Sequence, residues 1–268
     1  MVMLEIYLLG APRLCWDRSL ISIPRRQVRA LLYRLAAEME PISREHLCWL
    51  FWPDATQCEA HRNLSHLLTH LRHFLPLDLV LACNDDAISL VPQYTWSDSA
   101  AFLGLMSRRQ NVITTSEAEE AISLYHGPFL DSFVLDSSSE YENWIVMQRS
   151  LLERHYLTAL SLLAEKEKEK RHYPVAISYL QRSLAVDPLD ESTHRELMEI
   201  YAAAGNRVAA LREFDDYSDT LRREMAMEPL PETQALIRQL CNGYRMEEAG
   251  SKLQDAGGKK QDPAWQTA

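Results

Sequence analysis

Three helices followed by a β-hairpin are predicted near the N-terminus, and few folds share that order. The first helix is expected over about 25–38, where apolar residues recur at helical spacing directly after a proline. The second is expected to begin at Ser43, a good N-cap, and to end before Pro53. The third spans about 57–74.

Short strand-like runs complete the pattern. Residues 79–83 and 88–91 are rich in β-forming residues and predict the hairpin. Residues 3–9 and 20–23, on either side of a polar turn at 15–19, predict a small antiparallel sheet before the helices. Together these elements predict a winged helix-turn-helix, in which the third helix enters the major groove of DNA.

The third predicted helix has two faces of different character. Apolar residues share one face, which we expect in the core: Ala60, Leu64, Leu67, Leu68, Leu71 and Leu75. Side chains that can donate to base edges and phosphate oxygens share the other: Arg62, Ser65, His66, Thr69, Arg72 and His73. We interpret this second face as the DNA reader, with an ordinary solvated helix face as the alternative.

Four arginines lie at the starts of the first two helices, where main-chain N–H groups and guanidinium groups together favour a phosphate. They are Arg25, Arg26, Arg29 and Arg44. We expect them to position the DNA backbone rather than to read bases, and an ordinary surface role is the alternative. Arg29 lies one turn past Arg25 and Arg26, so it could instead pair with a nearby acid.

The second half of the chain carries helical periodicity with almost no strand signal. Ala176-Ile177 and Ala210-Leu211 recur at an offset of 34 residues, and Asp187-Pro188 closes the first unit. This period and these small residues predict tetratricopeptide-like helix pairs. Gly205 opens the turn of the second unit, but Arg171 stands at the matching position of the first, so we expect that unit to be degenerate.

The N-terminal part resembles the winged helix of SARP-type (antibiotic regulatory protein) bacterial activators. Four segments carry this resemblance: Ile23 to Leu32 (IPRRQVRALL), Ile42 to Leu47 (ISREHL), Leu50 to Asp54 (LFWPD) and Arg62 to Leu64 (RNL). Later segments resemble the helical activator domain that follows this winged helix in the same family: 124–130 (LYHGPFL), 144–164 and 228–233 (EPLPET). The resemblance covers about residues 3–240.

These patterns together predict a mainly α chain in four parts. Residues 1–98 are expected to form the winged helix (a small β-sheet, three helices and a hairpin wing) and 99–115 a linker. Residues 116–243 are expected to form the all-α, tetratricopeptide-like activator domain, and 244–268 a disordered tail.

The resemblance implies a sequence-specific transcription activator. It implies binding to direct repeats in double-stranded promoter DNA, as a pair of chains, and recruitment of RNA polymerase. The loop Trp52-Pro53-Asp54-Ala55-Thr56 is the expected polymerase contact, because in this fold it faces away from the base edges. Packing, with Trp52 buried, is the alternative role of this loop.

Composition limits these interpretations. A formal charge of −10, from 28 basic and 38 acidic residues, argues against coating nucleic acid by charge alone, so DNA contact must be local. No apolar run approaches the roughly 18 residues that a membrane span requires. The first residues lack the basic start of a signal peptide, and five scattered cysteines are typical of reduced thiols. We therefore expect a cytoplasmic protein with no membrane segment.

Two features weaken the DNA interpretation. Residues 1–98 hold nine Arg, no Lys and eleven acidic residues, and the tip of the predicted wing carries Asp85-Asp86, which phosphates would repel. We therefore expect modest affinity for a single site, with pairing of two chains on repeated half-sites as compensation.

Two alternative functions remain open. One is a protein-interaction scaffold whose winged helix has lost its affinity for DNA. The other is a metal-responsive regulator, because histidines at 61, 66, 70 and 73 include spacings that can bind zinc. Solvated histidines that touch phosphate are the preferred explanation of this spacing, and no ligand set is assigned. The sequence lacks phosphate-binding glycine loops and catalytic motifs, so we expect neither enzymatic activity nor a cofactor.

Overall fold

The computed structural model describes residues 3–75, 80–84, 86–107 and 113–241. The fold is mainly α with a small amount of N-terminal β-structure, as predicted. The chain divides into an N-terminal unit, Met1–Leu163, and a C-terminal unit, Ala164–Ala268, with the boundary inside α7 (Ser139–Glu169). Two predictions concern residues outside the described ranges: the acidic side chain of Asp85 at the wing tip and the disordered tail at 244–268.

The N-terminal sheet has four strands in the order β3-β2-β1-β7. Strands β1 (Leu4–Tyr7), β2 (Arg13–Trp16) and β3 (Ser19–Ile21) are antiparallel neighbours. Strand β7 (Thr95–Ser97) returns from the far side of the winged helix and pairs parallel to β1. The edge strand β7 was not predicted from the sequence pattern.

The polar turn predicted at 15–19 is wrong in its extent. Cys15 and Trp16 belong to β2, and only Asp17 and Arg18 form the turn, with φ of 48° and 64°. Two consecutive left-handed residues make the tight turn whose twist suits an antiparallel hairpin. Cys15 and Trp16 therefore remain in the strand.

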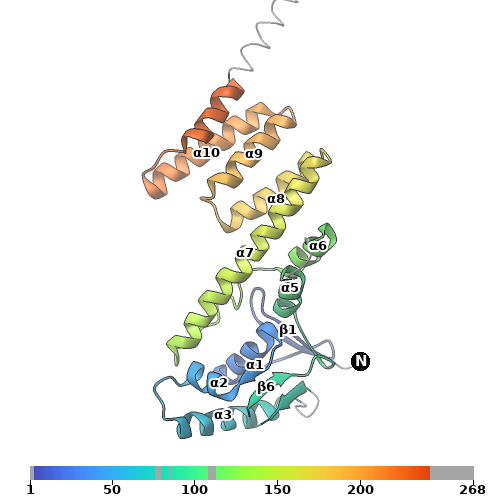
Figure 1. The fold of residues 1–268 in the computed structure, drawn as a ribbon, viewed down its shortest axis with the longest axis vertical. Coiled ribbons are helices and arrows are strands. Elements are labelled where there is room, and N and C mark those ends of the chain that lie inside the picture. Colours follow the sequence, from blue (N-terminus) through green and yellow to red (C-terminus); the bar gives the residue numbers. More distant parts are fainter. Residues whose placement is uncertain (1–2, 76–79, 85, 108–112, 242–268) are drawn as a thin grey trace, which may run out of the picture. The chain divides into compact units, whose positions relative to one another are not determined.

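The three predicted helices are confirmed as α1 (Arg26–Glu38), α2 (Arg44–Phe51) and α3 (Gln57–Arg72). In Figure 1 they lie together, with strand β6 (Ala87–Leu90) beside them. Ser43 caps α2 as predicted, because its hydroxyl accepts a hydrogen bond of 3.1 Å from the main-chain N–H of His46.

The predicted hairpin is confirmed and gains a third strand. Strand β5 (Leu81–Cys83) pairs antiparallel with β6, and the short β4 (Ile42–Ser43) pairs with the other edge of β6. The wing is thus attached through β4 to the residue that caps α2.

The segment predicted as a linker at 99–115 is largely helical. Helix α5 (Asp98–Met106) packs against α1 and against α6 (Thr115–Leu124). The side chain of Ser99 donates to the carbonyl of Ala37 at 3.0 Å. These contacts join α5 to the winged helix, and the chain divides into compact units at 163/164. The domain boundary expected near residue 98 stays a prediction.

Residues 127–131 also bind the N-terminal segment through their main chain. Leu130 N donates to Leu8 O at 2.8 Å, and Gly10 N donates to Pro128 O at 3.1 Å. A Cβ on Gly127 would lie 3.3 Å from the Cα of Gly10, so only glycine fits this approach without displacement.

The C-terminal unit consists of helix pairs with the predicted period. Helices α8 (Tyr173–Val186) and α10 (Arg207–Met225) begin 34 residues apart, α9 (Glu191–Ala203) packs against both, and residues 231–241 are helical. Ala164, Ala176, Leu180, Leu197 and Ile200 form a buried core in this unit. The tetratricopeptide-like architecture is therefore confirmed.

The turn at Arg171 is degenerate in sequence but not in geometry. Arg171 has φ of 61° and Gly205 has φ of 78°, both left-handed. In both turns the next residue's N–H donates at 2.8 Å to the carbonyl five residues earlier, from His172 to Glu167 and from Asn206 to Tyr201. The backbone pattern is thus kept where glycine is absent.

Asp98 joins α5 to the end of β1 and provides a test of this junction. It is 2% exposed, and its carboxylate accepts from the N–H groups of Leu8, Leu9 and Ser99 at 2.7, 3.0 and 2.7 Å. Asp98→Asn places an NH₂ group among these donors. We expect a loss of about 1–3 kcal/mol in the free energy of unfolding, measured by denaturant titration with Glu119→Gln as an exposed control.

This loss should depend on pH. Burial raises the pKa of Asp98 above its ordinary value, against the lowering effect of its three N–H donors. The folded state therefore binds the proton more tightly than the unfolded state, so this group's stabilisation is present at acidic pH and is lost as pH rises through the folded-state pKa. The wild type should exceed Asp98→Asn by more at about pH 4 than at about pH 7. A constant difference would contradict the burial of a titrating carboxyl here.

Candidate DNA-binding surface

Helix α3 begins at a complete capping box. The hydroxyl of Thr56 accepts from Glu59 N at 3.4 Å, and the Glu59 carboxylate accepts from Thr56 N at 3.2 Å. The Thr56 hydroxyl also donates to the Glu59 carboxylate at 2.7 Å, and this bond, followed by the one from Thr56 N, lowers the pKa of Glu59. This carboxylate is therefore held at the start of the helix.

The two predicted faces of α3 are confirmed as a buried face and an exposed face. The apolar residues are at most 6% exposed, and α3 packs through them against α1 and α2. The candidate readers are all exposed on the same helix: Arg62, Ser65, His66, Thr69, Arg72 and His73. The structure thus brings together the six residues on which the DNA interpretation depends.

Two of these readers have hydroxyls that already donate to the helix backbone. Ser65 Oγ donates to His61 O and Thr69 Oγ1 donates to Ser65 O, both at 2.9 Å. Each hydroxyl then presents only lone pairs to the outside. In this rotamer they can accept from the amino group of adenine or cytosine.

Arg25 and Arg26 extend this surface from the start of α1. Arg25 is the exposed N-cap of α1. The pKa of His70 on α3 is lowered mainly by desolvation of its ring and next by the positive charge of Arg25. Arg26 forms an exposed ion pair of 3.2 Å with Asp136. An exposed pair of this kind is weak, so a DNA phosphate can compete with Asp136 for the guanidinium.

The other two predicted phosphate contacts have structural partners. Arg29 Nη1 donates to the carbonyl of Ile23 at 2.8 Å, and its guanidinium lies 6.0 Å from the ring centre of Phe133. Arg44 Nε donates to the carbonyl of Asn84 at 3.0 Å, which fixes the wing turn to the start of α2. Among the described residues Arg29 thus binds main-chain carbonyls rather than an acid, and its contact with phosphate stays a prediction.

The predicted polymerase-contact loop lies between α2 and α3. Pro53, Asp54 and Thr56 are exposed, whereas Trp52 and Ala55 are half-buried. The Trp52 ring centre lies 5.6 Å from that of Phe51, so the packing role expected for Trp52 is present in part. This loop and residues 136–139 line a groove of about 430 Å³.

The histidines of α3 do not gather into a ligand set. The ring centres of His70 and His73 are 6.4 Å apart. Across residues 3–75, 80–84, 86–107 and 113–241, no group of three or more His, Cys, Asp or Glu side chains is placed to hold a metal ion. The metal-responsive alternative therefore gains no geometric support.

Sequence reasoning missed the contribution of residues 136 and 137. Asp136 binds Arg26, and the hydroxyl of Ser137 accepts from Gln27 Nε2 at 3.2 Å. Both contacts join residues 110 positions apart, and no local pattern signals them.

A family comparison decides the identity of the larger part of the chain. Residues 99–241 match the bacterial transcriptional activator domain. The chain belongs to this family. The match begins in α5, so the activator domain starts within the N-terminal unit and continues through the C-terminal unit.

A structural comparison supports the architecture of both parts. The activator-domain chain is similar to Mycobacterium tuberculosis EmbR in complex with a low-affinity phosphopeptide, with a TM-score of 0.67 and 19% sequence identity. The match covers 91% of this chain and 66% of that chain, so this chain spans just under two thirds of the EmbR chain. No curated protein matches. Among the described helices of the activator-domain chain, none combines the length and apolarity needed to cross a bilayer.

The position of His70 predicts the pH dependence of DNA binding. In the free protein its pKa is lowered, first by desolvation of the ring and then by electrostatic interaction with Arg25, His73 and His66. Phosphates would favour its protonated form and raise the pKa in the complex. The gain in affinity is then present below the free-state pKa and is lost as pH rises through the bound-state pKa. Affinity for a fixed DNA site should rise from about pH 8 to pH 6, and His70→Gln should reduce that rise.

A fall in DNA affinity with decreasing pH would instead indicate a metal site. If affinity fell with decreasing pH and a chelator abolished binding, a histidine-bound metal would be required.

Proposed function

We propose that this member of the activator-domain family binds promoter DNA through the exposed face of α3 and recruits RNA polymerase. One observation carries the DNA part. The chain has a formal charge of −10, yet α3 has no Asp or Glu after Glu59, which is engaged in the capping box. A carboxylate-free donor face on an acidic chain is suited to local contact with phosphates and base edges.

Pairing of two chains on repeated half-sites follows from the charge of the winged helix. Nine arginines and eleven acids in residues 1–98 leave no general attraction to DNA. Arg29 and Arg44 are also occupied by main-chain carbonyls. Simultaneous engagement of two half-sites would supply the missing affinity by effective concentration.

The loop from Trp52 to Thr56 is the proposed polymerase contact. Its residues 52–55, together with Phe51 and residues 136–139, line a groove whose walls are apolar, serine-rich and acidic, and none of the described residues that line it is basic. Such a groove suits a basic segment of a partner protein. Since Asp136 also binds Arg26, this groove lies beside a proposed phosphate contact.

Selection from random DNA tests the proposal. The purified chain should enrich a repeated motif and should increase transcription by bacterial RNA polymerase from a promoter that carries it. Enrichment without stimulation would remove the polymerase role. No enrichment above random sequence would favour the protein-interaction scaffold.

Arg62→Ala and Arg25→Ala should have different effects on binding. Arg62 is exposed at the N-terminal end of the reading face, so its loss should cost about 1–3 kcal/mol on the selected site and relax discrimination at one or two base pairs. Arg25→Ala should weaken binding evenly across sequences and lower the salt dependence. Retardation assays on selected and random DNA measure both, and identical profiles would contradict the division between readers and positioners.

Asp136→Asn should strengthen DNA binding. The change frees Arg26 and removes a negative charge near the phosphates. We therefore expect the affinity for DNA to rise about two- to fivefold at low salt. Asp17→Asn is the matched control, because it removes an equal charge at a left-handed position that asparagine accepts. Equal gains in both variants would mean that the effect is one of net charge and does not pass through Arg26.

A further inference from the structure

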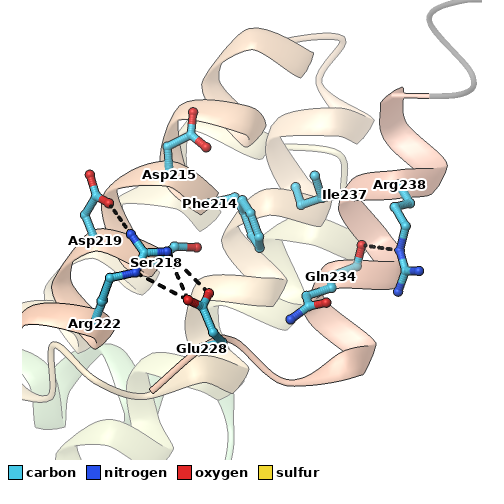
Figure 2. Close-up of a pocket in the computed structure, with 9 residues that line it drawn as sticks. All are labelled: Phe214, Asp215, Ser218, Asp219, Arg222, Glu228, Gln234, Ile237 and Arg238. Atoms are coloured by element: carbon cyan, nitrogen blue, oxygen red, sulfur yellow. Dashed lines mark hydrogen bonds and ion pairs between the residues drawn. The ribbon is translucent and has the colours of Figure 1, made fainter. Parts of the chain in front are cut away.

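An open groove of about 790 Å³ lies in the C-terminal unit between α10 and the helical residues 231–241. Figure 2 shows Phe214 of α10 and Ile237 of the last helix on its two sides, with Ser218 beside them. Small-molecule sites enclose most of the ligand surface, whereas an open groove suits a polypeptide segment. We propose that this groove binds an amphipathic helix of a partner protein, in which a large apolar residue lies between a basic and an acidic residue.

Ser218 supplies the first argument for a bound partner. It is 7% exposed, and in the described part of the chain its Oγ has no hydrogen-bond partner. Two other hydroxyls of this unit bond to their own helix: Thr220 Oγ1 donates to Asp216 O at 2.9 Å and Ser183 Oγ to Tyr179 O at 3.3 Å. Thr233 Oγ1 also lacks a partner among the described residues, but it does not line the groove. Ser218 therefore keeps an unused donor and acceptor at the groove, at a cost in stability that a bound polar group would offset.

The packing of the last helix supplies the second argument. Helix α9, inside the stack, buries Leu197, Met198 and Ile200 almost completely. In residues 231–241, by contrast, Leu236, Ile237 and Leu240 are only half-buried. Helical repeats bury such residues against the next helix of the stack. A helix is therefore the shape that covers this surface.

The charges of the groove define the pattern that the helix must carry. Arg222 is neutralised within the groove, because it binds Asp219 at 3.2 Å and Glu228 at 3.1 Å. Asp215 on α10 and Arg238 on the opposite helix form no ion pair with any described residue, and Arg238 only donates to the carbonyl of Gln234. The two walls thus present opposite unpaired charges on either side of the apolar residues.

This proposal does not depend on DNA binding by α3. A partner helix would place its basic residue near Asp215, its acidic residue near Arg238 and its apolar residue against Phe214 and Ile237. A main-chain or side-chain polar group would complete the hydrogen bonding of Ser218.

The test selects peptides from a phage-displayed library of helical sequences, about 15 residues long, on the immobilised full chain. The best peptide is then labelled, and its dissociation constant is measured by fluorescence anisotropy. We expect the enriched peptides to share the basic, apolar and acidic pattern. Asp215→Arg and Arg238→Glu should each weaken binding about tenfold, whereas Asp216→Arg, a charge change on α10 outside the groove, should not.

Two further variants separate binding from folding. Ser218→Ala should weaken peptide binding without lowering the melting temperature, because it removes a hydroxyl that has no partner in the free protein. A peptide with its basic residue changed to glutamate should regain affinity for Asp215→Arg.

Three results would overturn the proposal. The first is the absence of any enriched peptide, and the second is equal loss of binding in Asp215→Arg and Asp216→Arg. The third is self-association of the full chain that Asp215→Arg abolishes, which would make a second copy the occupant.

Discussion

Burial of helix α1 is the constraint on which the N-terminal unit depends. Nine of its thirteen residues are buried, and the helix packs against α3, α5, β6 and β7. Two of its carbonyls accept hydrogen bonds from distant side chains, Ala30 O from Tyr141 at 2.8 Å and Ala37 O from Ser99 at 3.0 Å. Tyr141 is fully buried, and burial raises its pKa well above the ordinary value, so it remains a neutral donor. One helix thus holds α3, the sheet and the first part of the activator domain in a single compact unit.

This arrangement gives a physical route from DNA contact to activation. The N-terminus of α1 carries Arg25 and Arg26, and Arg26 binds Asp136 just before α7 begins. Asp136 in turn lines the groove that includes the proposed polymerase loop. In the proposed function, a phosphate that attracts Arg26 would weaken its pair with Asp136 and change the charge of that groove. Promoter binding and polymerase contact would then share one side chain without any large movement.

Local patterns were sufficient to predict the elements whose signals are local. The three helices of the winged helix, the cap at Ser43 and the buried face of α3 follow from spacing within a few turns. The 34-residue repeat was visible because small residues recur at the same place in successive helix pairs. Strand β7 and helix α5 were not predicted, because their positions depend on partners such as Leu4 and Ala37, far away in sequence. Arg171 shows a further limit, since the turn between α7 and α8 holds a left-handed conformation at a residue type that seldom adopts it.

On the candidate surface, too, some features could be predicted from local spacing and others could not. A helical wheel was enough to place the six readers on one face, because α3 is regular and its apolar side is unambiguous. The arginines were harder, because their roles depend on what lies within reach of a long side chain. Arg29 reaches the carbonyl of Ile23, Arg44 reaches the wing turn, and Arg26 reaches Asp136. Only the folded chain distinguishes these partners.

Methylation interference on the selected DNA tests the central claim most directly, because it reports which groove the protein reads. If α3 lies in the major groove, methylation of guanine N7 within each half-site should block binding. Arg62→Ala should lose sensitivity at a guanine that the wild type contacts. Interference confined to adenine N3 in the minor groove, or an unchanged pattern in Arg62→Ala, would contradict the assignment of α3 as the reading helix.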